Sequence, residues 1–296
     1  MISLGIDVGG SSVKLAASAN GQVLWTAHSD SYSRASKNQL VDAIRDTAAG
    51  RAKGISTVGI CVPGRLDRIR RMITLSVNLP ALNGLRLDDL VADSVGRVEQ
   101  VELLNDSTSS AYDIYTSHRL TGRLVSITLG TGVGASVLDE GIPLMIEGDS
   151  PGHIGQLDVS IPGADVIGPD GGRGSLEGYI GGPALLQRYG PDMAKTLANL
   201  TEKDAPVQAL ARAIRIFHAI YRPQHVYFTG GIGIRLKHLL PTIQRMVNTD
   251  LTSVADPDWT IGTGEDDFHA AKGAAKLAAN AAGNGSRRHA PAAAAV

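Results

Sequence analysis

Residues 5–14 read Gly5-Ile6-Asp7-Val8-Gly9-Gly10-Ser11-Ser12-Val13-Lys14. The apolar run before the glycines predicts a buried strand that ends near a carboxylate, and the apolar run after the serines predicts a second strand. The glycines between them let a ligand approach the backbone closely, and the serines offer hydroxyl and N–H groups that suit phosphate oxygens. Asp7 is placed to hold Mg²⁺ through water, and Lys14 supplies a cation nearby.

The same residues are also compatible with an ordinary Gly-Gly hairpin that carries a surface aspartate. They do not form a Walker loop, because no Gly-x-x-x-x-Gly-Lys-Ser/Thr precedes a helix. Nor do they form a dinucleotide fingerprint, which needs Gly-x-Gly-x-x-Gly at the start of a helix. Partner motifs elsewhere in the chain therefore decide between a ligand site and a plain turn.

The composition limits the class of protein. A chain of 296 residues with 43% apolar and 19% charged residues is globular and large enough for one large or two moderate domains. A net charge of −1 gives no electrostatic support for binding nucleic acid or an anionic membrane. The single cysteine, Cys61, excludes an intrachain disulfide and a multi-cysteine zinc site. With no long apolar run and no signal peptide before the first strand, we expect a cytoplasmic protein.

Two further glycine turns follow predicted strands. The run Gly130-Thr131-Gly132-Val133-Gly134 comes after a strand predicted from Arg123 to Leu129, and it repeats the arrangement of the first turn. The run Thr229-Gly230-Gly231-Ile232-Gly233 follows a short apolar strand that begins at His225. Two turns of the phosphate-binding kind in separate parts of the chain predict two structurally related domains that bind one nucleotide.

A carboxylate also follows a predicted strand in the middle of the chain. The strand Val101-Glu102-Leu103-Leu104 leads into Asn105-Asp106, and a helix is predicted from Ser107 to Tyr115. Ligands of layered α/β domains bind at the carboxyl ends of strands, which favours a chemical role for Asp106. An aspartate at this place is equally typical of a helix N-cap, so both interpretations stay open.

Other segments carry weaker predictions. The arginines at 65, 68, 70 and 71 suggest an anion-binding patch, but a solvated hairpin face is the better interpretation. The Gly- and Pro-rich region from Gly141 to Gly182 is too long for a simple loop, and we expect it to be functional. A helix is predicted from Asp204 to Tyr221, and another that passes through Leu236 and Ile243 should kink at Pro241.

The order and spacing of the motifs resemble the ROK family, the sugar kinases and sugar-responsive repressors of the hexokinase, Hsp70 and actin superfamily. The resemblance implies an α/β protein with a two-lobed actin-like ATPase fold, which is ribonuclease H-like, with mixed sheets flanked by helices. It places the N-terminal lobe at residues 1–116 and the C-terminal lobe at residues 117–282. The low-complexity tail at residues 283–296 is expected to be disordered.

The resemblance also implies roles for single residues. Asp106 matches the catalytic base, which takes a proton from a sugar hydroxyl as that hydroxyl attacks the γ-phosphoryl group. The substrate-binding positions that match are Gly64, Asn78, Asn105, Asp106, His153 and Glu177. The nucleotide-binding positions that match are Asp7, Gly9, Gly10, Ser11, Ser12, Lys14, Gly130, Thr131, Gly132, Gly134, Gly230 and Gly231.

The sequence departs from the family pattern at two places. Many members carry a Cys-x-Cys-Gly-x-x-Gly-Cys-x-Glu segment that binds zinc, but here the three cysteine positions hold Gly168, Asp170 and Ser175. One carboxylate and one hydroxyl cannot replace three thiolates in a tetrahedral site, so we predict no structural zinc. Ser150 stands where the family has a glutamate that contacts the sugar, which leaves the identity of the hexose open.

The leading hypothesis is an ATP-dependent kinase of a hexose or an N-acetylhexosamine, with Mg²⁺ and without zinc. The alternatives are a catalytically weak sugar sensor and a kinase that uses polyphosphate. The repressors of the family carry an N-terminal helix-turn-helix, and this chain begins with the phosphate-loop strand, which favours the enzyme. The expected partners are a sugar and ATP, with no nucleic acid and no membrane, and the resemblance implies a homodimer.

Overall fold

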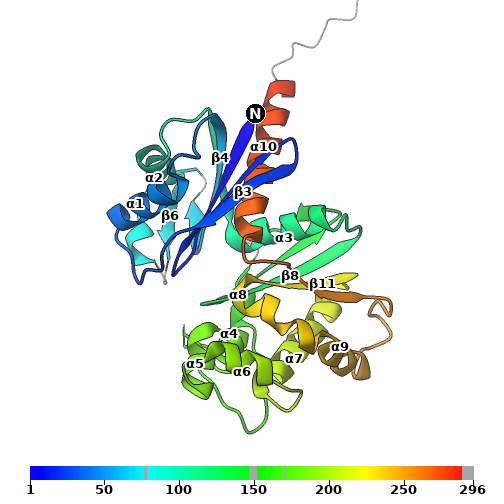
Figure 1. Ribbon diagram of the computed structural model, residues 1–296. Coiled ribbons are helices and arrows are strands. Elements are labelled where there is room, and N and C mark those ends of the chain that lie inside the picture. Colours follow the sequence, from blue (N-terminus) through cyan, green and yellow to red (C-terminus); the bar gives the residue numbers. More distant parts are fainter. Residues whose placement is uncertain (68, 77–78, 147–151, 170, 289–296) are drawn as a thin grey trace, which may run out of the picture. The chain divides into compact units, whose positions relative to one another are not determined.

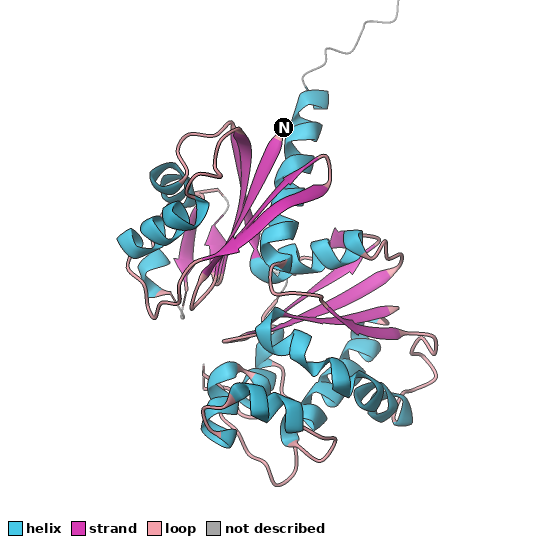
Figure 2. Cartoon of the chain, viewed as in Figure 1, coloured by secondary structure: helices cyan, strands magenta, loops and turns pink. Residues whose placement is uncertain are grey.

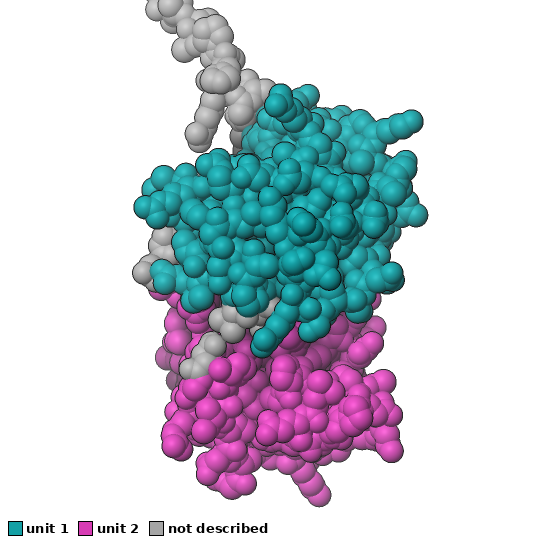
Figure 3. Space-filling model, turned by 90° about the vertical axis from the view of Figure 1, so that its left-hand side faces the viewer, with its two compact units in different colours: residues 1–113, 270–296 teal, residues 114–269 magenta. Residues whose placement is uncertain are grey.

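A computed structural model describes residues 1–67, 69–76, 79–146, 152–169 and 171–288. The chain divides into two compact units (Figure 3). The first unit combines Met1–Asp113 with the chain from Ala270 onward, and the second spans Ile114–His269. Within the described residues, each unit contains one five-stranded mixed sheet (Figure 2).

The sheet of the first unit has the order β3-β2-β1-β4-β7. Strand β2 runs antiparallel to β1 and β3, whereas β1, β4 and β7 are parallel neighbours. The carboxyl ends of those three strands therefore lie at one edge of the sheet. The elements of this unit are β1 (Ile2–Val8), β2 (Val13–Ala19), β3 (Gln22–His28), α1 (Lys37–Ala48), β4 (Ile55–Val62), β5 (Arg65–Asp67), β6 (Met72–Leu75), the 3₁₀ turn η1 (Pro80–Leu82), α2 (Leu87–Ser94), β7 (Gln100–Asn105), most of α3 (Asp106–Ser117) and nearly all of α10 (His269–Arg288).

Helices cover both faces of this sheet (Figure 1). On one face, alternate strand residues such as Leu4 and Ile6 are fully buried against α1 and α2. On the other face the intervening positions carry smaller residues, among them Gly5 and Gly59, where a Cβ atom would overlap the backbone of α10. The two-residue period of the strands thus separates a face of large side chains from a face of small ones, where a helix can approach closely.

The sheet of the second unit has the order β10-β9-β8-β11-β12. Strand β9 runs antiparallel to β8, and β8, β11 and β12 are parallel. Helix α7 contributes more buried residues to its core than any other element among the described residues, and Leu210, Ile214 and Phe217 are buried at helical spacing. The elements are β8 (Arg123–Leu129), β9 (Val133–Asp139), β10 (Ile142–Pro143), η2 (Ile154–Gln156), α4 (Leu176–Ile180), α5 (Gly182–Tyr189), α6 (Met193–Asn199), α7 (Ala205–Tyr221), β11 (His225–Thr229), α8 (Gly230–Gly233), η3 (Ile234–Leu239), α9 (Leu240–Thr249) and β12 (Thr260–Thr263).

The α/β class and the mixed sheets agree with the sequence prediction, and three details differ. The boundary between the units follows Asp113, and the final helix belongs to the first unit rather than to the C-terminal part of the chain. Helix α10 also extends to Arg288, so residues 283–288 of the predicted disordered tail are helical, while residues 289–296 lie outside the described residues. Pro241 lies in the first turn of α9 and does not kink a longer helix, because a proline fits where no backbone donor is needed.

In the part of the chain that the structure describes, every helix is too short or too polar to span a lipid bilayer.

Candidate functional site

Strand register brings several predicted site residues of the first unit to one edge of its sheet. Asp7 pairs with Cys61 between β1 and β4, and Val62 pairs with Asn105 between β4 and β7. Gly64 follows the end of β4 with a φ of +117°, a left-handed conformation that favours glycine. The end of β1, the turn after β4 and the start of α3 are therefore neighbours, as expected for a ligand site at the carboxyl ends of strands.

The first glycine turn is a compact loop between β1 and β2. The Gly9 N–H donates to the Ser12 carbonyl at 3.0 Å, which closes the turn around Gly10 and Ser11. Tyr32 lies beyond the hairpin and holds the turn from outside, because its hydroxyl donates to the Gly9 carbonyl at 2.7 Å and its N–H donates to the Ser11 carbonyl at 2.8 Å. Tyr32 was not among the sequence-predicted site residues.

At the start of α3, the residue that caps the helix is not the residue predicted to be the base. The Asn105 side-chain oxygen accepts from the Ser107 and Thr108 N–H groups at 3.1 and 3.2 Å and from the Ser107 hydroxyl at 2.5 Å. Asn105 is therefore the residue that caps the helix. Asp106 is the first helical residue, and its carboxylate accepts from the adjacent Ser107 N–H at 2.7 Å.

The pKa of the Asp106 carboxyl is raised in the folded protein. Burial raises the pKa of the Asp106 carboxyl above its ordinary range, while the Ser107 N–H and the charge of Lys14 oppose that shift. A displaced carboxyl pKa in a candidate site is typical of a general base, because the group must exchange a proton during the reaction.

Cys61 lies behind this group of residues and is fully buried. Its thiol is 3.4 Å from the Ile6 carbonyl oxygen and 3.9 Å from Asp7 Oδ1. Burial raises the pKa of the Cys61 thiol, and the charges of Asp7 and Asp106 act in the same direction. The only cysteine of the sequence is thus a neutral packing residue beneath two carboxylates.

In the second unit, the other two glycine turns lie side by side. Strands β8 and β11 are parallel, Thr128 pairs with Thr229, and the two threonine hydroxyls are 2.9 Å apart. The turn that begins at Gly130 and the turn that begins at Gly230 therefore leave the same edge of the sheet. Gly230 has a φ of +78°, and a Cβ atom there would lie 2.5 Å from the Leu129 carbonyl oxygen, so only glycine fits this position.

Glu177 and His153 lie near the second glycine turn within this unit. Glu177 is in the first turn of α4, and its Oε2 accepts from the Val133 N–H at 3.0 Å. His153 is exposed and precedes η2, where a Cβ atom at Gly155 would lie 3.0 Å from Glu177 Oε2. Within the first unit the predicted residues gather at one edge of its sheet, and within the second unit a separate set gathers near the second glycine turn.

The segment that corresponds to the family's zinc motif is held by hydrogen bonds. Ser175 caps α4 by accepting from the Gly178 N–H at 3.1 Å. The Gly174 N–H donates to the Val166 carbonyl at 3.0 Å, and the Gly168 N–H donates to the Gly172 carbonyl at 2.8 Å. Across residues 1–67, 69–76, 79–146, 152–169 and 171–288, no three histidine, cysteine or acidic side chains are grouped as metal ligands. The absence of zinc remains a prediction.

Some sequence-predicted positions lie outside the described residues. These are Asn78, assigned to the sugar, Ser150, which replaces a family glutamate, Asp170 of the former zinc segment, and Arg68 of the arginine cluster.

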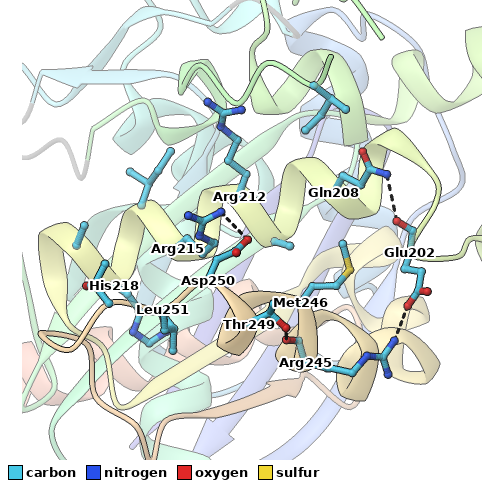
Figure 4. Close-up of a pocket in the computed structure, with 15 residues that line it drawn as sticks. Glu202, Gln208, Arg212, Arg215, His218, Arg245, Met246, Thr249, Asp250 and Leu251 are labelled. Carbon is cyan, nitrogen blue, oxygen red and sulfur yellow. Dashed lines mark hydrogen bonds and ion pairs between the residues drawn. The ribbon is translucent and has the colours of Figure 1, made fainter. Parts of the chain in front are cut away.

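A pocket between α7 and α9 in the second unit contains none of the predicted site residues (Figure 4). Arg215 pairs with Asp250 at 2.9 Å, Arg245 pairs with Glu202, and Arg212 donates to the Ser160 carbonyl at 2.7 Å. These guanidinium groups point in different directions in Figure 4 and do not converge on one anion site.

Comparisons with known proteins give a consistent result. The model of the ROK family matches residues 3–281. A glucokinase from Thermotoga maritima is 26% identical over 263 residues, which cover 78% of this chain and 82% of the relative. An N-acetyl-D-glucosamine kinase from Erwinia tasmaniensis is 26% identical over 292 residues, which cover 86% of this chain and 91% of the relative.

A solved structure shows the same fold. A ROK family glucokinase from Streptomyces griseus, crystallised in complex with glucose and AMPPNP, matches with a TM-score of 0.73 at 20% identity. The match covers 95% of this chain and all of the other chain.

Proposed function

The chain belongs to the ROK family, and we propose that it transfers the γ-phosphoryl group of ATP to a hydroxyl of a hexose or an N-acetylhexosamine. The observation that carries this proposal is the environment of Asp106. Its carboxylate is at the carboxyl end of β7, its helix is capped by Asn105 instead, and burial raises its pKa. A carboxylate that is not needed as the cap is available as the base.

In the proposed reaction, Asp106 takes the proton of the attacking sugar hydroxyl. The hydroxyl oxygen then forms a bond to the γ-phosphorus, the bond from that phosphorus to the β–γ bridging oxygen breaks, and ADP leaves. Phosphoryl transfer relies mainly on positioning and on stabilising spread negative charge. The amides of the first turn, Lys14 and the turn at Gly130 are suited to that task.

Further assignments belong to the same proposal. The turn that begins at Gly230 contacts the adenosine, and Asn78, Asn105, His153 and Glu177 contact the sugar. Asp7, which is 7% exposed, would hold Mg²⁺ through water, and the ion would neutralise phosphate charge. We also propose that the protein is cytoplasmic and that it is a homodimer. Sedimentation of the purified protein measures the number of subunits.

The activity is tested by coupled ADP release with glucose, N-acetylglucosamine, mannose and related sugars. We expect turnover with at least one of them. Sugar binding without turnover would indicate a sensor, and turnover with polyphosphate but not with ATP would reassign the donor.

The base is tested by Asp106→Asn. We expect kcat to fall by about 10²–10⁴-fold, because a positioned general base typically contributes that much. Nucleotide affinity should stay near that of the unmodified protein. Full turnover in this variant would show that another group is the base.

A further inference from the structure

The side chain of Glu177 reaches the backbone of the second glycine turn. The Val133 N–H donates to Glu177 Oε2 at 3.0 Å. Five residues after Glu177, at the start of α5, the Gly182 N–H donates to the Gly130 carbonyl at 2.9 Å. The two ends of the turn are therefore both bound by one short segment of chain, and the amides of Thr131 and Gly132 take part in neither bond.

Helix α4 is a rigid support for this carboxylate. Leu176, Tyr179 and Ile180 are at most 1% exposed, so the helix is anchored in the core of the second unit. The Tyr179 hydroxyl donates to the Ala164 carbonyl and accepts from the Ile161 N–H, both at 2.8 Å. Because these contacts fix the helix, they also fix the position from which Glu177 reaches the turn.

Three glycines lie beside the Glu177 side chain. A Cβ atom at Gly155 would lie 3.0 Å from Glu177 Oε2, and one at Gly132 would lie 3.3 Å from it. A Cβ atom at Gly181 would lie 3.1 Å from Glu177 Cγ. Side chains at these three positions would crowd Glu177, and at Gly155 and Gly181 they would also overlap the carbonyl oxygens of Val133 and Glu177, so the glycines leave room for this contact.

We propose that Glu177 is a positioning residue for ATP, because its carboxylate holds the phosphate-binding turn at Gly130 in the conformation that presents the Thr131 and Gly132 amides. This inference rests on the proposed function, and it gives Glu177 a role besides the sugar contact that the family resemblance implies. A hydrogen bond from an amide to a charged acceptor is stronger than one to a neutral acceptor, so the charge of Glu177 strengthens its hydrogen bond with the Val133 N–H.

The test compares Glu177→Ala and Glu177→Gln with Glu202→Gln, a matched control at a half-exposed carboxylate of the same unit. The affinity for AMPPNP with Mg²⁺ is measured by calorimetry without sugar, and KM for ATP, KM for sugar and kcat are measured separately. We expect Glu177→Ala to weaken AMPPNP binding by on the order of tenfold. Glu177→Gln keeps an acceptor oxygen and should recover part of that loss, and Glu202→Gln should change nothing.

Hydrogen exchange of the ligand-free proteins supplies a readout that does not depend on activity. The Val133 amide should exchange faster in Glu177→Ala than in the unmodified protein and the control.

Unchanged exchange at Val133 with unchanged AMPPNP affinity, and a rise only in KM for sugar, would overturn the inference while leaving the kinase proposal intact. An unmodified protein without turnover on any sugar would instead contradict the proposed function, and the exchange of Val133 would still decide the role of Glu177. If Glu177→Ala does not fold, the near-isosteric Glu177→Gln tests the role of Glu177 through its AMPPNP affinity and the hydrogen exchange of the Val133 amide.

Discussion

Asn105 and Asp106 are adjacent polar residues with different tasks. From the sequence, Asp106 was equally suited to cap a helix or to act as a base. The structure gives the cap to Asn105, whose amide oxygen accepts three hydrogen bonds at the start of α3. The two residues differ in role because the capping residue must precede the first helical residue. Asp106 is already the first residue of the helix, so Asn105 is at the capping position.

The raised pKa of Asp106 predicts how activity depends on pH. A base must be ionised to accept a proton, so activity is lost as the pH falls through its pKa in the folded protein. Because burial raises that pKa, kcat/KM for the sugar should fall at a higher pH than an ordinary aspartate, near 3.9, would cause. A pH–rate profile that stays flat down to the ordinary value would contradict this assignment.

The same shift predicts a cost in stability. A carboxyl whose pKa is raised on folding stabilises the protein below its unfolded pKa, and this contribution is lost as the pH rises through the folded value. Asp106→Asn should therefore raise the unfolding temperature at pH 7, and the gain should disappear below the ordinary aspartate pKa. Thermal unfolding at both pH values measures this difference, and an unchanged or lower midpoint at pH 7 would contradict it.

Glycines determine how closely α10 packs in the first unit. A Cβ atom at Gly273 would overlap the backbone carbonyl of Ser109 in α3, just as Cβ atoms at Gly5 and Gly59 would overlap α10. Alanine in a helix interior is normally more favourable than glycine by about 1 kcal/mol. At Gly273 the sign should reverse, because the added methyl group forces two backbones apart.

We expect Gly273→Ala to lower the free energy of unfolding by about 1–3 kcal/mol, which is typical of an overpacked core. Asn280→Ala, at an exposed position of the same helix, removes only a surface hydrogen bond to the Tyr112 hydroxyl and should have a smaller effect. Chemical denaturation of both variants measures the difference. A more stable Gly273→Ala protein would show that helix propensity outweighs the close contact.

The former zinc segment leads to a prediction about metal removal. The Gly174 N–H donates to the Val166 carbonyl, the Gly168 N–H donates to the Gly172 carbonyl, and Ser175 caps α4, so these backbone groups have protein partners. Treatment with a chelator should leave the thermal unfolding midpoint unchanged, and turnover should return when Mg²⁺ alone is added back. Elemental analysis that finds one zinc per chain, together with loss of structure on chelation, would contradict this.

The glycine turns could be predicted from the sequence because their signal is local. Each consists of an apolar strand followed at once by glycine and hydroxyl residues; the first two turns lie between their predicted strands, whereas the third glycine run forms the short helix α8 after β11. The contacts that hold the turns have no such signal. Tyr32 bonds Gly9 across 23 positions and Glu177 bonds Val133 across 44, and a side chain that reaches a distant backbone group leaves no periodic pattern.

Among the described residues, the two large hydrophobic clusters belong to different units, and a small third cluster around Cys61 and Ala274 belongs to the first unit. The residues of one large cluster all belong to the first unit, and those of the other all belong to the second. The place of α10 illustrates why sequence order misled the prediction of the boundary, since this helix returns to β1 and β4 from the far end of the chain. Close packing against Gly5 and Gly59 of the sheet decides the unit to which α10 belongs, and proximity along the chain does not.

Separate cores predict that the units unfold as separate cooperative blocks. Leu40 in α1 is fully buried in the first core and Phe217 in α7 is 1% exposed in the second, so Leu40→Ala should cost about 2–5 kcal/mol and Phe217→Ala about 3–5 kcal/mol. Each variant should lower one component of the calorimetric transition and leave the other in place, with a van't Hoff enthalpy below the calorimetric one. A single transition that both variants shift equally would mean that the two cores unfold as one block.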